Sequence, residues 1–231
     1  SGGSGMSGVT SIATPAWWMA GAQLAVVKSV QDPQSLGRVQ IQLYGADPDG
    51  SALVWARVST PFAGSDYGAF LIPDVDEEVM VLFLGGDARY PVVVGSLWNG
   101  SHSLPETLGG DRVDRWTLTG KAGTRIAIVE ESGQEMVEIE TPGGAKATLT
   151  DGNGGEITLT VSSHTITMGS AGVSIETSGE FSVDASSISM TAGSVTVTSG
   201  SSDFSGTVSC LSLSTPSVKS GSYTPGAGNI W

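Results

Sequence analysis

The stretch that decides the fold of this chain is residues 157–197, which read ITLTVSSHTITMGSAGVSIETSGEFSVDASSISMTAGSVTV. Apolar residues recur in it as pairs two positions apart, and Ser or Thr stands beside them. A period of two is typical of a β-strand with one apolar face. The stretch therefore predicts a series of short strands that turn every seven to nine residues. The apolar pairs are Ile157 and Leu159, Ile166 and Met168, Val173 and Ile175, Phe181 and Val183, Ile188 and Met190, and Val195 and Val197.

Such short strands cannot be stable alone. Fixing the backbone costs about 1–2 kcal/mol per residue, and two half-buried aliphatic side chains return about 3–5 kcal/mol at most. Stacking on many neighbours has to supply the difference, and a single-chain β-helix needs longer coils to close on itself. We therefore predict that each chain supplies one side of a three-sided tube. The predicted architecture of residues 121–218 is an intertwined triple-stranded β-helix in a homotrimer, with the paired apolar residues on the trimer axis.

The first half of the chain has a different pattern. Apolar and polar residues alternate through residues 22–104, and Gly, Pro and Asp mark turns between the runs. In the clearest run, Val39, Ile41 and Leu43 share one face. Five or six short strands in this length indicate a small β-barrel or sandwich, so the whole chain is predicted to be all-β. The predicted strands are 24–30, 38–44, 53–59, 68–72, 77–84 and 91–97.

The composition excludes several classes of function. A formal net charge of −13 argues against a nucleic-acid partner, because phosphate binding needs a surplus of Lys and Arg. Cys210 is the single cysteine, so neither a disulfide within the chain nor a CxxC zinc site is possible. The longest apolar run, residues 79–84, is far shorter than the roughly 18 residues of a membrane-spanning helix.

No sequence motif of an enzyme or a metal site is present. Neither G-x-S-x-G nor H-E-x-x-H occurs. We therefore predict no catalytic residue, no metal ligand and no cofactor. His164 stands inside a strand repeat, in Ser-Ser-His-Thr, and is predicted to lie on the outer face.

Two groups of charged residues are predicted to face solvent. The first precedes the last two barrel strands and consists of Asp74, Asp76, Glu77 and Glu78. The second is a basic collar between the two halves of the chain and consists of Arg112, Arg115, Lys121 and Arg125.

The remaining segments join or end these two parts. Residues 1–5 read SGGSG and are typical of an engineered linker, so a native start is predicted at Met6. Residues 6–21 form a predicted extension, in which the apolar Trp17, Trp18 and Met19 either dock on a partner or cover the end of the barrel. Residues 105–120 are predicted to be a neck. Residues 219–231 are predicted to be a tip.

Several stretches of the first half resemble one known domain. They are WARVSTPFAG at 55–64, YGAFLIP at 67–73, DEEV at 76–79, GD at 86–87, PVVVG at 91–95 and WNG at 98–100. In this order they resemble the OB-fold domain of contractile-injection spikes. These are the baseplate assembly protein V spikes of contractile phages and the valine–glycine repeat protein G of type VI secretion. The resemblance covers about residues 22–105, and the repeats match the family's triple-stranded β-helix in kind.

The resemblance implies a structural protein rather than an enzyme. Such a homotrimeric spike sits in the baseplate of a phage tail or a phage-tail-like particle. It assembles in the bacterial cytoplasm, seats on hub and tail-tube proteins, and is driven through a target cell envelope. The expected hub-docking residues are Trp17, Trp18 and Met19. A PAAR-repeat tip protein is expected to dock on Gly226, Gly228, Asn229, Ile230 and Trp231.

Three departures from the family pattern qualify these expectations. Asp76 stands where the family usually has Gly, and Asp tolerates a positive φ better than most residues. The larger hub domain of type VI spikes has no counterpart here, which indicates the short phage type. Some short phage spikes bind iron through His-x-His, but His102 and His164 form no such motif, so no apical iron is expected.

Two other functions compete with the spike. A trimeric β-helical polysaccharide depolymerase, similar to phage tailspikes, needs paired carboxylates in a groove with aromatic platforms. The repeats contain few acids and only Phe181 and Phe204 as aromatics, which disfavours this function. An OB-fold nucleic-acid binder needs stacking aromatics in a basic groove, and the charge balance disfavours it.

Overall fold

A computed structural model describes residue 19 and residues 21–222 of the chain. The described residues contain β-strands and two single turns of 3₁₀ helix, η1 (Leu84–Gly86) and η2 (Gly152–Gly154), so the all-β prediction is confirmed. No helix among them is long and apolar enough to cross a lipid bilayer. Contacts divide the chain into two units that part after Gly179.

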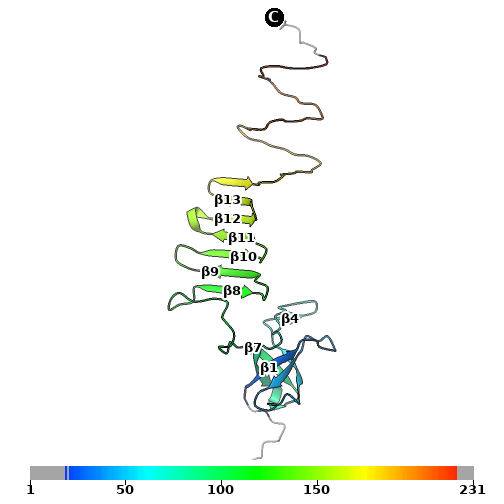
Figure 1. Ribbon diagram of the computed structural model, residues 1–231, viewed down its shortest axis with the longest axis vertical. Coiled ribbons are helices and arrows are strands. Elements are labelled where there is room, and N and C mark those ends of the chain that lie inside the picture. Colours follow the sequence, from blue (N-terminus) through cyan, green and yellow to red (C-terminus); the bar gives the residue numbers. More distant parts are fainter. Residues whose placement is uncertain (1–18, 20, 223–231) are drawn as a thin grey trace, which may run out of the picture. The chain divides into compact units, whose positions relative to one another are not determined.

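Five strands near the N-terminus close into a barrel (Figure 1). Their order around the barrel is β1-β2-β3-β7-β6, and every pairing is antiparallel except that of β3 with β7. This confirms the predicted N-terminal barrel. The strands are β1 (Gln23–Ser29), β2 (Val39–Leu43), β3 (Val54–Val58), β6 (Glu78–Phe83) and β7 (Pro91–Ser96).

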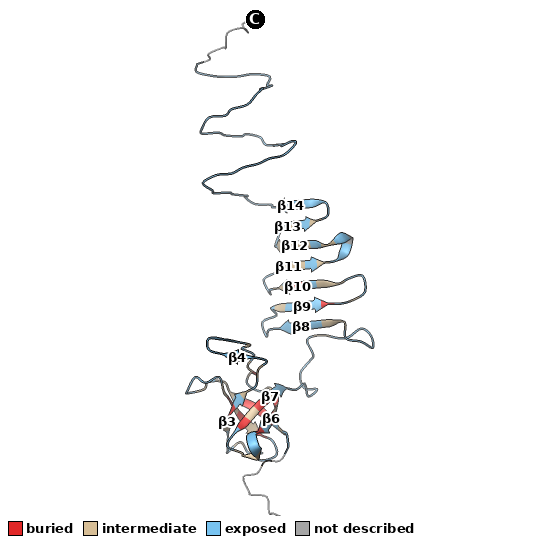
Figure 2. Ribbon diagram, turned by 180° about the vertical axis from the view of Figure 1, so that it is seen from behind, coloured by how far each residue is buried: buried red, intermediate tan, exposed pale blue. Residues whose placement is uncertain are grey.

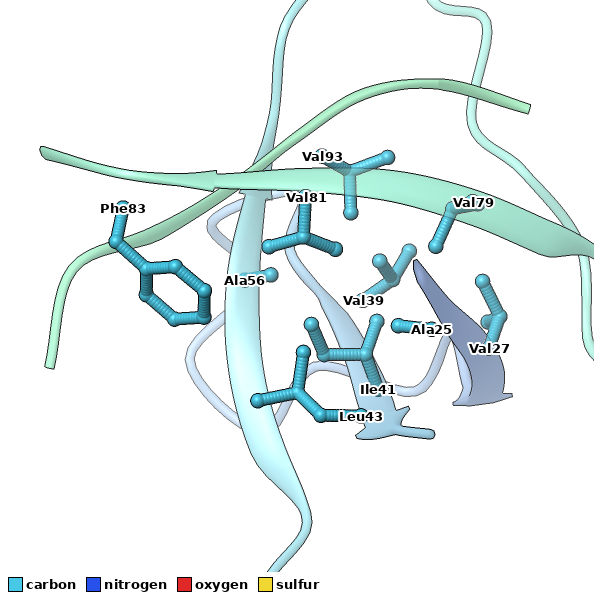
Figure 3. Packing of buried hydrophobic residues seen from close by; sticks show 10 residues of the cluster. All are labelled: Ala25, Val27, Val39, Ile41, Leu43, Ala56, Val79, Val81, Phe83 and Val93. Carbon is cyan, nitrogen blue, oxygen red and sulfur yellow. The ribbon is translucent and has the colours of Figure 1, made fainter. Parts of the chain in front are cut away.

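The barrel has the only extended hydrophobic core among the described residues. Alternate residues of each strand point inward, as Val39, Ile41 and Leu43 do on β2. Figure 3 shows these side chains meeting those of the other strands in the barrel interior. The core consists of Ala25, Val27, Val39, Ile41, Leu43, Ala56, Val79, Val81, Phe83 and Val93.

A predicted strand over residues 68–72 is wrong. The structure instead forms a short hairpin from β4 (Ala63–Gly64) and β5 (Tyr67–Gly68), and residues 69–72 pair with no strand. The apolar residues that suggested the strand do not share a buried face. Ile72 packs against the core, whereas Phe70 is 83% exposed.

Seven further strands form one antiparallel sheet in which each strand pairs only with its neighbours in sequence. The order is β14-β13-β12-β11-β10-β9-β8 (Figure 1). β8 lies within residues 105–120, which the sequence assigned to a neck. The strands are β8 (Arg115–Thr119), β9 (Arg125–Val129), β10 (Met136–Glu140), β11 (Ala145–Thr150), β12 (Glu156–Val161), β13 (His164–Gly169) and β14 (Gly172–Glu176).

The second unit, described from residue 180 to residue 222, contains no strand. Its trace winds back and forth without forming a sheet (Figure 1), and every one of its described residues is exposed. A strand needs a hydrogen-bonded neighbour, and this segment has no neighbour in its own chain. The sequence pattern therefore predicts strands here that a single chain does not form.

That the last three apolar pairs line a trimer axis stays a prediction, because it concerns three chains. They were predicted to be strand residues buried on an axis, but within one chain they belong to no strand and their side chains are exposed. The physical reason is that nothing in the same chain covers them, although their pattern matches that of β12 to β14. The residues concerned are Phe181, Val183, Ile188, Met190, Val195 and Val197.

Candidate functional site

Two columns of apolar side chains run across the seven-stranded sheet on one face. Residues paired directly across antiparallel strands project on the same side, so the register defines each column. The first column is Trp116, Ile128, Val137, Leu149, Ile157, Met168 and Val173. The second is Leu118, Ile126, Ile139, Ala147, Leu159, Ile166 and Ile175.

These columns remain uncovered in the single chain. Trp116 is 56% exposed, Ile139 47% and Ile175 52%. In Figure 2 the buried residues are concentrated in the barrel and are sparse in the strands of the sheet. A continuous apolar face of this length is unusual for a soluble monomer and marks an interaction surface. We call it the apolar face.

The apolar face contains the first three apolar pairs that the sequence identified. These pairs, from Ile157 to Ile175, lie side by side on β12, β13 and β14. Sequence analysis missed the part of the face on β8 to β11, although the same signal was present. In β9, for example, Ile126 and Ile128 alternate with Arg125 and Ala127.

His164 was predicted on the outer face, and this is wrong. The two-residue turn after β12 pairs His164 with Val161, so the His164 ring lies on the same face as Ile166. Ser162 in that turn has a φ of 54°, which is typical of two-residue hairpin turns. The Nδ1 atom of His164 lies 2.7 Å from Oγ1 of Thr177. Strand periodicity gives the same result, because His164 stands two residues before Ile166 in β13.

The opposite face of the sheet is mostly polar, although the buried Ala127 and Val129 also lie on it. It includes a column in which Thr148, Thr158, Thr167 and Ser174 follow one another. Near β8 to β11 it carries a network of ion pairs centred on Glu138, which is only 7% exposed. The carboxylate of Glu138 lies 2.7 Å from Nη1 of Arg125 and 2.6 Å from Nζ of Lys146.

Glu106 brings the segment before β8 into the same network. One of its carboxylate oxygens lies 2.9 Å from Nη2 of Arg125, and the other lies 3.7 Å from Nη1 of Arg115. Arg115 also contacts Asp114, at 2.8 Å, and Glu131. The hydrogen bond from Arg115 to Asp114 is the main reason that the pKa of the Arg115 guanidinium is raised.

The predicted solvated collar is therefore wrong for two of its four members. The side chains of Arg115 and Arg125 are only 19% and 23% exposed and are held in ion pairs. Arg112 is exposed. Lys121 is exposed as well and pairs with Asp74, whose pKa this contact lowers.

The acidic group before β6 is only partly solvent-facing, because its members have local partners. Glu77 accepts a hydrogen bond from Oγ of Ser96 at 3.2 Å, and Glu78 accepts one from Nδ2 of Asn99 at 3.2 Å. Asp76 has a φ of 68°, a conformation that Asp tolerates better than most residues with a side chain. Its amide donates to the carbonyl of Val27 at 2.9 Å and so joins this turn to β1.

Of the predicted hub-docking residues, Met19 is described. It packs against the barrel core, and its amide donates to the carbonyl of Gly86 at 2.8 Å. Trp17 and Trp18 lie outside the described residues, as do all the predicted tip residues from Gly226 to Trp231.

The described residues offer no evident catalytic constellation. No group of three or more His, Cys, Asp or Glu among them is placed to hold a metal ion. Every buried polar side-chain atom in this part of the chain has a hydrogen-bond partner. The carboxylates on the polar face of β10 are partly engaged with Arg and Lys, and the two large apolar columns lie on the other face. The main chemical capacity of this arrangement is association.

Comparison with protein families agrees with both parts of this architecture. Residues 23–98 match a family model described as the type VI secretion system/phage-baseplate injector OB domain. Residues 136–201 match a second model, the phage baseplate V C-terminal trimerisation domain. Together the matches cover more than half of the chain. The chain carries the phage baseplate V OB domain and C-terminal trimerisation domain. The resemblance in the barrel stretches is thereby confirmed, and the second match supports a homotrimer.

Curated relatives of this phage baseplate V chain are type VI secretion spike proteins. The spike protein VgrG4b of Pseudomonas aeruginosa is 30% identical over 129 residues, which are 51% of this chain and 16% of the relative. VgrG1a of the same species is 32% identical over 140 residues, or 54% of this chain and 22% of the relative. The actin cross-linking toxin VgrG1 of Vibrio cholerae is 31% identical over 87 residues, or 36% and 8%. The chain therefore spans less than a quarter of the length of these relatives.

Proposed function

We propose that this phage baseplate V chain is the structural central spike of a contractile injection machine. The observation that carries the proposal is the apolar face, which is uncovered in one chain and lies from β10 to β14 within the match to a trimerisation domain. Three copies that turn this face inward would bury both columns along a common axis. A structural spike of this kind needs no catalytic residue.

In the proposed trimer, the axis is lined by the apolar face and by the apolar pairs that follow it in residues 180–222. The sheet of each chain supplies one side of the tube over β8 to β14. The later apolar residues pair with strands of the other two chains, which cover the side chains that one chain leaves exposed. The formal charge of −13 per chain keeps the Ser- and Thr-rich outer surface soluble. These later residues are Phe181, Val183, Ile188, Met190, Val195 and Val197.

The ends of the spike give it its place in the machine. The barrel seats on hub and tail-tube proteins, with Trp17 and Trp18 as docking side chains and Met19 anchoring them to the barrel. A PAAR-type tip protein docks at Gly226, Gly228, Asn229, Ile230 and Trp231. On contraction the spike is driven through the target envelope. The machine is a phage tail, a tailocin or an extracellular injection system, assembled in the bacterial cytoplasm.

The proposal is tested by the mass of the purified chain in solution, measured by light scattering. We expect about three times 23.5 kDa. Replacing Ile139 on the apolar face by Asp should abolish the trimer, because three carboxylates would be buried near the axis without partners. Ile139 is 47% exposed in one chain, so the substitution disturbs that chain's own sheet little.

The matched control is Thr167→Asp, which places the same charge on the polar face, opposite Thr158 and Ser174. This variant should remain a trimer. A monomeric wild-type chain, or a trimer that tolerates Ile139→Asp as well as Thr167→Asp, would show that the apolar face is not the trimer axis.

A further inference from the structure

A second uncovered apolar surface lies on the barrel rather than on the sheet. Residues 62–71, which include β4 and β5, are here called the aromatic hairpin. Phe70 is 83% exposed, Tyr67 68%, Leu71 59% and Phe62 58%. Asp66 is the only charged residue in this segment. Such a concentration of exposed aromatic side chains marks a docking element.

The aromatic hairpin is held in shape by its own backbone. The amide of Ala69 donates to the carbonyl of Phe62 at 3.1 Å, and the hydroxyl of Thr60 donates to the carbonyl of Ala69 at 2.5 Å. A Cβ on Gly64 would lie 2.2 Å from the Tyr67 ring, so the ring packs directly on this glycine. The aromatic side chains are therefore presented by a defined backbone, which lowers the entropic cost of docking.

The same barrel carries a complementary surface on its outer wall. Leu24 of β1 pairs with Met80 of β6, and Leu82 of β6 pairs with Val92 of β7. All four side chains point outward, because the residues that alternate with them form the core. Leu24 is 46% exposed and Leu82 41%. We call these four residues the apolar wall.

We propose that the aromatic hairpin of one chain packs on the apolar wall of the next chain, so that the three barrels form a closed ring. This inference rests on the proposed trimer. The hairpin and the wall are different surfaces of one barrel, and contact between unlike surfaces closes into a ring when a rotation axis is imposed. The trimerisation domain, matched over residues 136–201, imposes such an axis on the same chain.

Tethering favours a second copy as the occupant. Residues 97–114 join the last barrel strand to the first strand of the sheet. Three barrels held by such short connections stay at an effective concentration of about millimolar. At that concentration the barrel of a neighbouring chain meets the hairpin before any separate protein does.

The test is disulfide cross-linking of the full-length chain in a Cys210→Ser background. The variant with both Phe70→Cys and Leu82→Cys should give covalent dimers and trimers on a non-reducing gel after boiling in SDS. Each single variant should run as a monomer. The matched control joins Phe70→Cys to Gln40→Cys, which lies on the polar outer side of β2, and should cross-link far less.

The outcomes separate this inference from the proposed function, because light scattering is measured on the same samples. A trimeric mass without cross-links would overturn the hairpin contact but not the proposed trimer. A cross-link within one chain would have the same consequence. Dimers formed by Phe70→Cys alone would show that hairpins meet each other, which also overturns it. Cross-linking of the Phe70→Cys and Gln40→Cys control to the same extent as the test variant would also overturn the hairpin contact. A monomeric mass overturns both the trimer and the ring.

Discussion

Among single residues, Asp32 shows how one side chain organises a whole loop. Its carboxylate accepts hydrogen bonds from the backbone amides of Gln34 and Leu36, at 3.1 and 2.9 Å. It also lies 2.7 Å from Nη2 of Arg38, the residue just before β2. The Arg38 guanidinium is the main reason that the pKa of Asp32 lies far below its usual range. The loop between β1 and β2 thus depends on a charged carboxylate.

Replacing Asp32 by Asn should lower the melting temperature of the barrel at pH 7. A carboxyl whose folded-state pKa is depressed stabilises the fold fully above its unfolded pKa of about 4. That contribution is lost as the pH falls through the folded-state pKa. The difference between wild type and variant should therefore shrink as the pH is lowered below about 4. Thermal unfolding followed by circular dichroism at a series of pH values measures it.

The control for this prediction is Asp49→Asn, which changes an exposed carboxyl in the next loop. This variant should change the melting temperature little at any pH in the series. A difference between wild type and Asp32→Asn that stays constant down to the lowest pH would contradict the role assigned to the charge.

At the level of elements, the sequence predicts strands where one face of the strand is buried. It does not predict which elements contact one another. The barrel strands lie within two residues of their predicted bounds, and in β2 and β6 the inward residues alternate with outward ones. Residues 68–72 failed because Phe70 is apolar but faces outward, a reversal that period and composition do not reveal. The network around Glu138 was missed because its partners come from separate strands and from the segment before β8.

Replacing Glu138 by Ala should destabilise the sheet. The change leaves Arg125 and Lys146 without the carboxylate that they share, and losing hydrogen bonds to a charged group typically costs about 1.5–3 kcal/mol. Unfolding in guanidinium chloride gives the difference. Glu140→Ala, on the same face of the same strand, is the matched control and should cost less. Equal losses in the two variants would mean that the network contributes nothing particular.

For the whole molecule, the two units differ in where their backbone partners lie. Strands β8 to β14 find partners within one chain, whereas residues 180–222 find none. This division was only partly visible in the sequence. The repeats of apolar pairs look alike on both sides of Gly179: Val183 and Met190 stand in the same pattern as Ile175, which is in β14. Side-chain periodicity reports which face is buried and not which chain supplies the neighbour. The trimerisation match spans the division, from residue 136 to residue 201.

Ending the chain at Gly179 should therefore preserve association but weaken it. The shortened chain retains the apolar face, so light scattering should still give a trimer at high concentration. It lacks the segment that we propose to pair with the other chains. The full-length trimer should therefore resist SDS without boiling, whereas the shortened trimer should dissociate. A shortened trimer as resistant to SDS as the full chain would show that residues 180–222 do not hold the chains together.

The neighbour-to-neighbour order of the sheet also bears on how the chain folds. Each strand from β8 to β14 meets only the strands next to it in sequence, so its contacts have low contact order. Local pairings of this kind form in microseconds, long before three chains encounter one another. A sheet can therefore assemble hairpin by hairpin as it leaves the ribosome. In the proposed trimer, only the association of the chains then depends on their concentration.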